Sequence, residues 1–388
     1  MSKNEKKIIE KSDWMSNFTL VGTAKVNDYT FKIDEKAEKS DWIYNSLNLG
    51  VDCGEKYGTV YAEMSGGYSS DAGKPNVIYA HGKKDDDTDD FSTQILVDWD
   101  DRFDEGILET IGDLSFITVG LEKTDKDKTF YKKFLSAYDA IEYIKAHLTD
   151  GMVVNVKGNL KYSMYQGKTQ VRKNITSVVL SKAEPDKYSA RFTQSILVDK
   201  YSASLKNIDK NKGVMYVDAR VLDYLKELNG IEVKGQYPFA KQFEFEMDFT
   251  NEQMCKKIME KLFKVTKDID QITFEGDLIE GGAVVMATLD DIPEDIKELI
   301  EIGVFTEEEA LVRCSTNGNR EQRMVLRKPY IKLVGDEKKP VIQRFERKYK
   351  DEDLVLDYLD EANEAVEDDG NAEETTGGSD LDWLNALD

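Results

Sequence analysis

Histidine and cysteine are scarce in this sequence. Its 388 residues include two histidines, His81 and His147, and three scattered cysteines, Cys53, Cys255 and Cys314. No CxxC pair occurs, so we expect neither a disulfide framework nor a cysteine zinc site, and a reducing, cytoplasmic compartment is predicted. The sequence also lacks HExxH, P-loop and GxGxxG motifs. An enzyme is therefore the less favoured class, and we assign no catalytic residue, metal or cofactor.

Long apolar runs are missing as well. No stretch of 18 apolar residues occurs, and the opening MSKNEKKIIEKSDW is charged with no apolar segment behind it. We expect no membrane-spanning helix and no secretory signal. Hydrophobic residues make up 40% of the chain and aromatic residues 10%, which is enough for real cores. The length predicts two or three domains.

Basic residues are absent from the end of the chain. The sequence has 53 Lys and Arg against 76 Asp and Glu, but no Lys or Arg follows Lys350, while residues 351–388 contain fifteen acids. Residues 1–350 therefore carry a net charge of only −8. The Gly-, Ser- and Thr-rich end predicts a flexible acidic tail. Its tip, SDLDWLNALD, has the features of a docking peptide, although an accidental apolar cluster is the alternative.

Two segments of the body are basic. Residues 151–183 hold six basic residues and no acid, and residues 313–350 hold twelve basic residues and four acids. Such islands in an acidic protein favour a polyanionic partner, with the tail as a competitor. A solvated strand face is the alternative explanation for each island.

Strand patterns surround the first island. In residues 152–164 the apolar side chains alternate with Asn155, Lys157, Asn159 and Lys161, and Gly158 indicates a bulge or bend. A turn at 165–168 leads into a second strand at 171–180. A helical stripe covers 131–148, and strands are predicted at 18–32, 42–52 and 59–68. Three strands, a helix and a hairpin follow the order of an OB-fold, a five-stranded barrel.

The second half repeats this plan. Strands are predicted at 192–198, 214–221, 231–233 and 242–249, followed by a helix and by ITFEGDL, which parallels NVKGNL around its glycine. The similarity between FSTQILVD (91–98) and FTQSILVD (192–199) is weaker evidence for duplication. The expected fold is mainly β with helical insertions (α+β): two OB-like five-stranded barrels in tandem and a disordered acidic tail. The predicted parts are a charged N-terminal arm (1–14), a first barrel (15–185) with an insertion at about 74–126, a second barrel (186–350) with a helical insertion at about 290–313, and the tail (351–388).

These features resemble the phage and bacterial single-stranded DNA-binding proteins, which combine OB-folds with an acidic C-terminal tail. The resemblance lies in the VVNVKGNLKYSMYQGK hairpin, the helix before it and the tail ending DLDWLNALD. It implies sequence-independent binding and protection of single-stranded DNA, and recruitment of replication or recombination proteins by the tail. It also implies the cytoplasm of a bacterial cell, or of the host cell for a phage protein. In that class the tail usually ends in an apolar or aromatic residue, whereas Trp383 lies five residues inside this one and Asp388 is last.

The candidate contacts follow from the chemistry of this partner, since Lys and Arg neutralise phosphates and aromatic rings stack on bases. The candidates in the first barrel are Lys157, Lys161, Tyr162, Tyr165, Lys168, Arg172 and Lys173. Tyr162 follows the apolar phase of its strand, so packing is an alternative role. The candidates in the second barrel are Arg320, Arg323, Arg327, Lys328, Tyr330 and Lys332. The candidate partner-binding residues of the tail are Asp380, Asp382, Trp383, Leu384 and Leu387.

Two other function classes remain open. OB-like barrels also serve as interaction modules, so a phage structural or assembly protein is one alternative. The other is a magnesium-dependent nuclease or polymerase accessory enzyme, for which Asp98, Asp100, Asp101 and Asp104 form the best acidic cluster.

Overall fold

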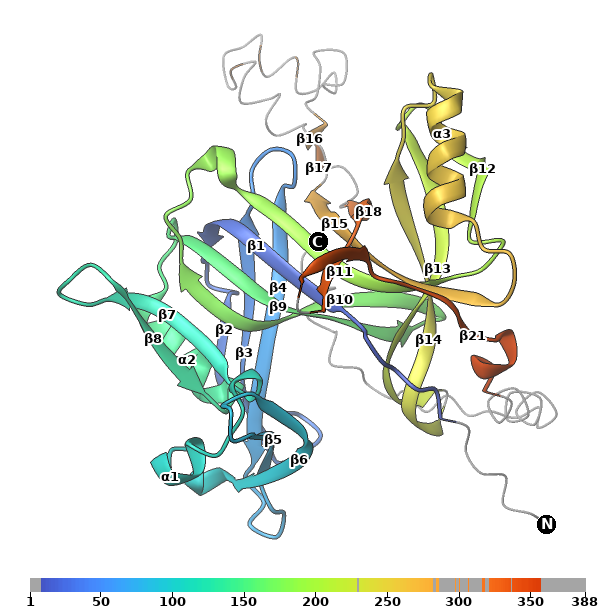
Figure 1. Ribbon diagram of the computed structural model, residues 1–388. Coiled ribbons are helices and arrows are strands. Elements are labelled where there is room, and N and C mark those ends of the chain that lie inside the picture. The colour runs from blue at the N-terminus through green and yellow to red at the C-terminus, as the bar shows by residue number, and fades with distance from the viewer. Residues whose placement is uncertain are drawn as a thin grey trace, which may run out of the picture.

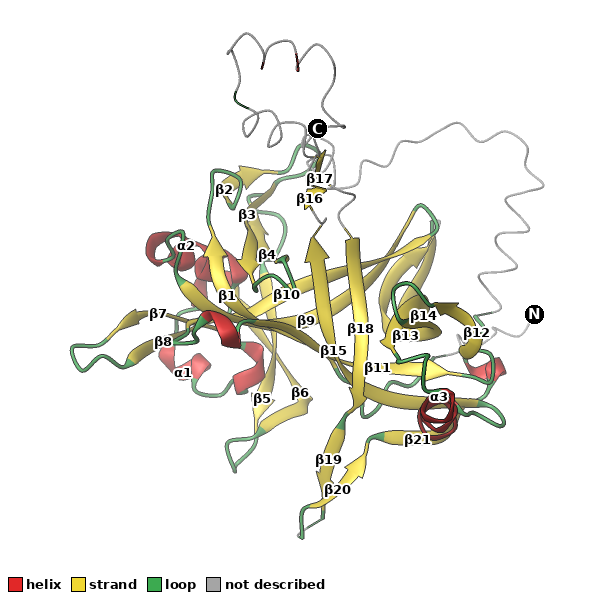
Figure 2. Ribbon diagram, turned by 90° about the horizontal axis from the view of Figure 1, so that it is seen from above, coloured by secondary structure: helices red, strands yellow, loops and turns green. Residues whose placement is uncertain are grey.

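The computed structural model describes residues 8–228, 230–281, 321–335 and 337–356, with a few isolated residues between 284 and 317. Strands dominate these residues, in agreement with the predicted mainly β class (Figures 1 and 2). The α-helices are α1 (Glu105–Leu108), α2 (Ala137–His147) and α3 (Glu252–Ile258), and a π turn, Met259–Phe263, continues α3. Short 3₁₀ turns lie at Trp99–Asp101, Asp113–Ser115, Pro185–Lys187 and Asp351–Asp353. The predicted helical insertion at about 290–313 lies outside the described residues.

Five strands close the first barrel: β1 (Ser16–Lys25), β3 (Trp42–Asp52), β4 (Thr59–Ser69), β9 (Val153–Tyr165) and β10 (Lys168–Leu180). β1 pairs with β3 and β9, β3 with β4, and β9 with β10, all antiparallel. A parallel contact between β4 and β10 closes the circle. In the chain, α2 lies between β4 and β9, after the insertion and the strands β7 and β8. This is the OB-fold topology, so the predicted first barrel is confirmed.

The second barrel has the same topology. Its strands are β11 (Ser189–Val198), β13 (Val214–Leu228), β14 (Ile231–Glu246), β15 (Ile269–Gly281) and β18 (Glu321–Pro329). β11 pairs with β13 and β15, β13 with β14, and β15 with β18, again antiparallel, and β14 meets β18 in parallel. α3 lies between β14 and β15 in the chain, as α2 lies between β4 and β9.

Further strands decorate both barrels: β2 (Phe31–Lys36), β5 (Val77–Lys83), β6 (Asp89–Asp98), β7 (Ile117–Lys123), β8 (Thr129–Phe134), β12 (Ala203–Asp209), β16 (Val284–Val285), β17 (Thr316–Asn317), β19 (Ile331–Val334), β20 (Lys339–Ile342) and β21 (Arg344–Tyr349). The predicted insertion at 74–126 forms the separate hairpin β5–β6, α1 and the strand β7. β7 pairs with β10 and β8, so it extends the sheet of the first barrel. The helix predicted from residue 131 begins only at Ala137, because β8 occupies 129–134 and Ser136 caps the helix by accepting the Tyr138 N–H.

One strand pair joins the two barrels. β1 and β11 run antiparallel, and Phe18 lies opposite Phe192. On its other side Phe18 lies opposite Gly158 of β9, and Phe192 lies opposite Gly276 of β15. The register also shifts beside each glycine, where Thr176 and Arg327 are the extra residues of β10 and β18. The barrels are thus equivalent units related about the Phe18–Phe192 pair. The strand equivalent to β11 is β1, so the repeat at 91–98, which lies in β6, is no sign of duplication.

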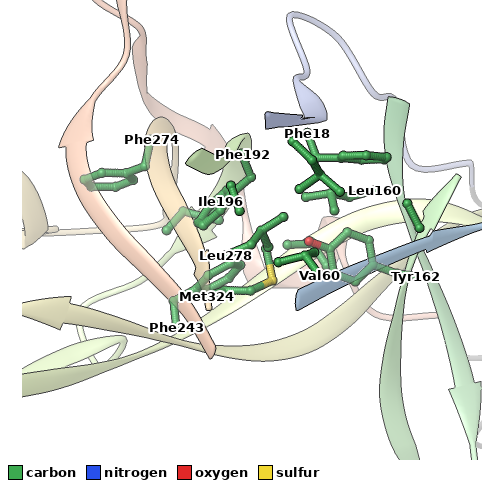
Figure 3. Close-up of a cluster of buried hydrophobic side chains, with 14 of the residues drawn as sticks. Phe18, Val60, Leu160, Tyr162, Phe192, Ile196, Phe243, Phe274, Leu278 and Met324 are labelled. Atoms are coloured by element: carbon green, nitrogen blue, oxygen red, sulfur yellow. The ribbon is translucent and has the colours of Figure 1, made fainter. Parts of the chain in front are cut away.

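The core runs through this junction without a break. One buried cluster contains Phe18 and Leu160 from the first barrel and Phe192, Phe243 and Phe274 from the second, and Figure 3 shows these side chains close together. The two barrels therefore share a hydrophobic core, as well as a sheet.

Both described ends pack on the second barrel. Ile9 is buried, Gln271 donates to the carbonyls of Ser12 and Asp13, and the Tyr349 hydroxyl donates to the carbonyl of Glu10. Residues 8–14 of the predicted N-terminal arm are therefore part of the folded body. At the other end Leu354 and Leu356 are buried. The first residues of the predicted tail, 351–356, therefore include side chains that are buried in the folded body.

Candidate nucleic-acid interface

The hairpin β9–β10 gathers five of the predicted residues on one face. Exposed and buried positions alternate along β9, as the sequence pattern predicts, and Lys161 lies directly opposite Arg172, while Tyr165 lies opposite Lys168. Residues opposite each other in a pair of strands share a face. We call this set the hairpin face: Lys157, Lys161, Tyr165, Lys168 and Arg172.

Tyr162 lies on the opposite side of β9 and is 4% exposed. Its hydroxyl donates to Oε1 of Gln194 at 3.0 Å, and its backbone N–H donates to Oδ2 of Asp223 at 2.8 Å. Burial, with a smaller contribution from the Asp223 charge, raises the pKa of the phenol far above its usual value. Tyr162 packs between the barrels and presents no ring to a base. Its inclusion among the binding candidates is a wrong prediction.

Lys173 is also buried, at 6% exposure. It alternates with Val171 and Ile175 in β10, and its amine forms an ion pair with the equally buried Glu280 of β15. A second oxygen of Glu280 accepts the backbone N–H of Tyr61 at 3.1 Å. The Lys173 charge is thus neutralised inside the molecule by Glu280, and this ion pair links the two barrels. Lys173 is therefore also removed from the candidate set.

The cations of the hairpin face differ in their partners. Lys161 lies 3.5 Å from Asp223 but keeps half of its side chain exposed, and Arg172 lies 3.9 Å from Glu63 with both side chains exposed. The Arg172–Glu63 pair is exposed and therefore weak. Asp223 is buried, and Lys11 also lies 3.9 Å from it, so Lys161 is the outer of two lysines beside a buried carboxylate. Lys157 is exposed and forms no ion pair within the described part of the chain. These three cations remain available to phosphates.

Lys157 belongs to a polar row that crosses six strands. Successive partners in the register are Lys133, Thr118, Ser177, Lys157, Thr19 and Arg191. Neighbouring strands lie about 4.8 Å apart, so the row spans about 24 Å from β8 to β11. It carries three basic side chains and no acid. It continues the hairpin face across the junction of the barrels.

Three members of this surface were missed by the sequence analysis. Arg191 is exposed and has no ion pair among the described residues, and its signal was its place in the polar phase of β11. Lys133 pairs with Asp113 at 2.9 Å, where both side chains are largely exposed. Tyr131 lies two residues before Lys133 on the same face and is 59% exposed. The segment TFYKKF carried the signal for both, but the predicted helix concealed it.

Four of the candidate cations in the second basic island are paired with acids. Arg323 pairs with Glu244, Arg327 with Glu246 and Asp277, Lys328 with Glu275, and Lys332 with Asp13. Lys332 lies in the separate hairpin β19–β20, because β18 ends at Pro329. Tyr330 is half-buried, and its backbone joins Thr273 and Gln343. Arg320 lies outside the described residues, as do the tail residues Asp380, Asp382, Trp383, Leu384 and Leu387.

A cavity of about 370 Å³ brings the two islands together. Lys168 of the hairpin face lines it from the first barrel, and Lys241 and Arg323 line it from the second. The remaining lining residues are Thr169, Ala240, Gln242, Glu244, Gln322 and Met324. The tip of the β9–β10 hairpin therefore forms one wall of a hollow on β14 and β18.

His81 lies between a carboxylate and a hydroxyl, an arrangement that the sequence did not suggest. Its Nε2 lies 2.6 Å from Oδ1 of Asp89, and its Nδ1 lies 2.8 Å from Oγ of Ser115. The Ser115 oxygen also accepts the His81 backbone N–H, and Asp89 accepts the backbone N–H of Leu114. These bonds fasten β5–β6 to the turn at Asp113–Ser115. We call them the His81 clasp and assign them a structural role.

The described residues contain no group of three or more His, Cys, Asp or Glu side chains placed to hold a metal ion. The acids of the magnesium alternative include Asp104, whose side chain caps α1 by accepting the Ile107 N–H. None of the described helices is long and apolar enough to cross a membrane.

Comparisons with known proteins give two findings. Residues 117–296 match the model of a family described as YorF. The single-stranded DNA-binding protein of Thermus aquaticus has a similar structure, with a TM-score of 0.30 and 10% identity over 69% of this chain and 86% of that one. A deletion variant of that protein gives the same TM-score and identity over 70% and 89%. No curated protein matches this chain.

Proposed function

We propose that this protein binds single-stranded DNA without sequence preference. The observation that carries the proposal is the hairpin face, along which Lys157, Lys161, Arg172 and Lys168 lead to the half-exposed Tyr165 at the tip of the hairpin. The face lies on an OB barrel, a fold whose surface commonly holds oligonucleotides. Cations there release counterions from the phosphates, while the tyrosine ring stacks on a base. The row through Lys133 and Arg191 extends the same surface toward the second barrel.

The acidic segment after residue 356 has a separate role in this proposal. It holds twelve acids and no base, and its tip contains Trp383 and Leu384. In our proposal the segment competes with DNA for the basic surface and, when displaced, recruits replication or recombination proteins. Such binding both protects single-stranded DNA and brings the enzymes that act on it.

Titration with fluorescent oligo-dT at several salt concentrations tests the proposal. Replacement of Lys157, Lys161 and Arg172 with alanine should weaken binding and reduce the slope of log affinity against log salt by up to about 2, since each lost contact with a single strand removes about 0.7. The variant should fold, because the three side chains project outward and the buried Asp223 carboxylate keeps Lys11 and the backbone N–H groups of Tyr162 and Tyr224 as partners.

A matched control keeps the same change of net charge. Lys206, Lys210 and Lys212 are exposed on the second barrel, in and after β12, and their replacement with alanine should leave the slope nearly unchanged. Parent protein that shows no salt-sensitive binding would instead favour the alternative of a structural or assembly protein. An equal effect of the two triple variants would mean that only total charge matters, and would remove the hairpin face from the site.

A further inference from the structure

Lys241 occupies a position where the pattern of its strand requires an apolar side chain. In β14 it lies between Phe239 and Phe243, which are both buried, and it pairs with the buried Ala219 of β13. Its side chain is half-buried and lines the cavity between the barrels. Within the described residues it has neither an ion pair nor a side-chain hydrogen bond. A lysine held in this way has lost water and gained no counter-charge.

The charges around the cavity do not balance. Lys168, Lys241 and Arg323 line it, and Glu244, which pairs with Arg323, is the one acid among the lining residues. Nearby Glu280 is paired with Lys173. Burial first, and the Lys173 charge second, lower the pKa of Lys241. The cavity thus contains two cations in excess of its carboxylates.

Lys168 connects this cavity to the hairpin face. It is exposed at the start of β10, opposite Tyr165, and it also lines the cavity. A strand that follows the hairpin face toward its tip is therefore led to the cavity. Its volume is in the range of small-molecule sites and exceeds what a single phosphate group requires.

We propose that the cavity is a phosphate subsite, in which Lys241 and Lys168 bind the backbone of the single strand that lies on the hairpin face. This inference rests on the proposed function and adds to it a site that both barrels form together. The subsite supplies the anion that Lys241 lacks in the free protein. It also explains why a cation stands in the apolar phase of β14, where it weakens the fold.

Lys241→Gln tests the proposal, with Lys241→Arg as the variant that keeps the charge and Lys206→Gln as the control on an exposed strand. Loss of a charge-assisted contact should weaken oligo-dT binding about tenfold and reduce the salt slope by about 0.7. Lys241→Arg should retain most of the slope, and Lys206→Gln should match the parent. The glutamine variant should unfold at the same denaturant concentration as the parent, or at a higher one, because an unpaired half-buried charge is removed. If Lys241 had only a structural role, Lys241→Gln would unfold at a lower denaturant concentration and would keep the parent affinity and salt slope.

Acylation of lysines followed by mass spectrometry gives a second readout on the intact protein. Oligo-dT should protect Lys241 and Lys168 and leave Lys206 reactive, while dTMP at the same phosphate concentration should protect neither. If the parent fails to bind oligo-dT, the proposed function itself fails. If the parent binds but Lys241 stays reactive and Lys241→Gln keeps the parent affinity and slope, only the subsite is wrong. Protection by dTMP and not by oligo-dT would also overturn the subsite, because the cavity would then be a site for free nucleotides.

Discussion

Two glycines occupy equivalent places at the junction of the barrels. A Cβ on Gly158 would lie 1.9 Å from the Asn174 carbonyl oxygen and 2.7 Å from the Phe18 ring. A Cβ on Gly276 would lie 2.4 Å from the Val325 carbonyl oxygen and 2.3 Å from the Phe192 ring. The phenylalanines that meet at the junction can pack only because both neighbouring strands lack a side chain there.

Gly158→Ala should therefore destabilise the whole molecule, as should Gly276→Ala. Forcing a methyl group against backbone costs about 1–3 kcal/mol or more, measured as a shift of the urea midpoint. Gly50→Ala is the control, because the atoms nearest to its Cβ would be side-chain atoms of Thr59 and Tyr61, at 3.2 Å, and not backbone. Equal midpoints for Gly158→Ala and Gly50→Ala would show that the junction tolerates a methyl group.

The buried pair Lys173–Glu280 should contribute to the stability of the fold and not to DNA binding. Lys173→Met leaves the Glu280 carboxylate buried without its cation, and removal of one partner of such a pair costs about 3–5 kcal/mol. Lys173→Met with Glu280→Leu should recover much of that loss in urea unfolding. For protein that remains folded, the salt slope for oligo-dT should match the parent. A reduced slope would mean that Lys173 reaches the DNA after all.

At the scale of elements, alternation along the strands could be predicted from sequence, and contacts between barrels could not. The period of two in 152–164 correctly separated Lys157 and Lys161 from the core, and the shared glycine pattern correctly predicted the equivalence of β9 and β15. The same rule places Lys173 with Val171 and Ile175, so the sequence already held evidence for its burial. Glu280, its partner, lies 107 residues away, and no local pattern connects the two.

The boundaries of the decorations were the least predictable feature. The apolar stripe of α2 extends back to Phe134, which is why the sequence predicts a helix from residue 131. Residues 129–134 nevertheless form β8, because they pair with the edge of β7. Likewise β19 leaves the barrel after Pro329 and pairs with β20. In both cases tertiary pairing overrides the local pattern.

The His81 clasp holds the hairpin β5–β6, whose own core is small. His81→Ala should speed amide hydrogen exchange in residues 77–98 at pH 7, while exchange in the barrel strands stays slow, because the hairpin forms a separate sheet. Exchange measured by mass spectrometry would reveal this, and equally fast exchange throughout would contradict a local role.

The clasp should also weaken in acid. The Leu114 N–H, followed by the contact with His81, lowers the pKa of Asp89. A carboxyl group with a lowered pKa stabilises the folded form above its ordinary value near 3.9, and this contribution is lost as the pH falls through the lowered pKa. Relative to the intrinsic exchange rate of each amide at the same pH, residues 77–98 are therefore expected to lose protection below about pH 4.

At the scale of the whole molecule, the two equivalent barrels differ in charge. Around the shared glycine the first barrel has Lys157 and Asn159, while the second has Glu275 and Asp277. These acids of β15 pair with Lys328 and with Arg327 and Lys56. Beside this glycine the cations of the second barrel are therefore paired with acids, whereas Lys157 of the first barrel has no ion pair among the described residues.

This asymmetry determines where an acidic segment can compete with DNA. Residues 357–388 carry a formal charge of −12 and start from the second barrel, where Leu354 and Leu356 are buried. In our proposal the segment, tethered there, has a high effective concentration near the hairpin face and the cavity. Truncation after Leu356 should tighten oligo-dT binding, most strongly at low salt, where screening is weakest. Truncation after Lys350 would also remove the buried leucines and is the poorer test.

The apolar tip should act independently of this competition. A variant with Trp383→Ala and Leu384→Ala keeps all twelve acids, so its oligo-dT affinity should match the parent at every salt concentration. Its capture of replication or recombination proteins in the presence of DNA should be lost, because a buried Trp supplies much of the affinity of such peptides. The two variants thus separate the effect of the charge from that of the tip. Truncation should change both oligo-dT affinity and protein capture, and the double variant should change protein capture alone. Weaker DNA binding after truncation would refute competition, and undiminished capture by the double variant would refute docking through the tip.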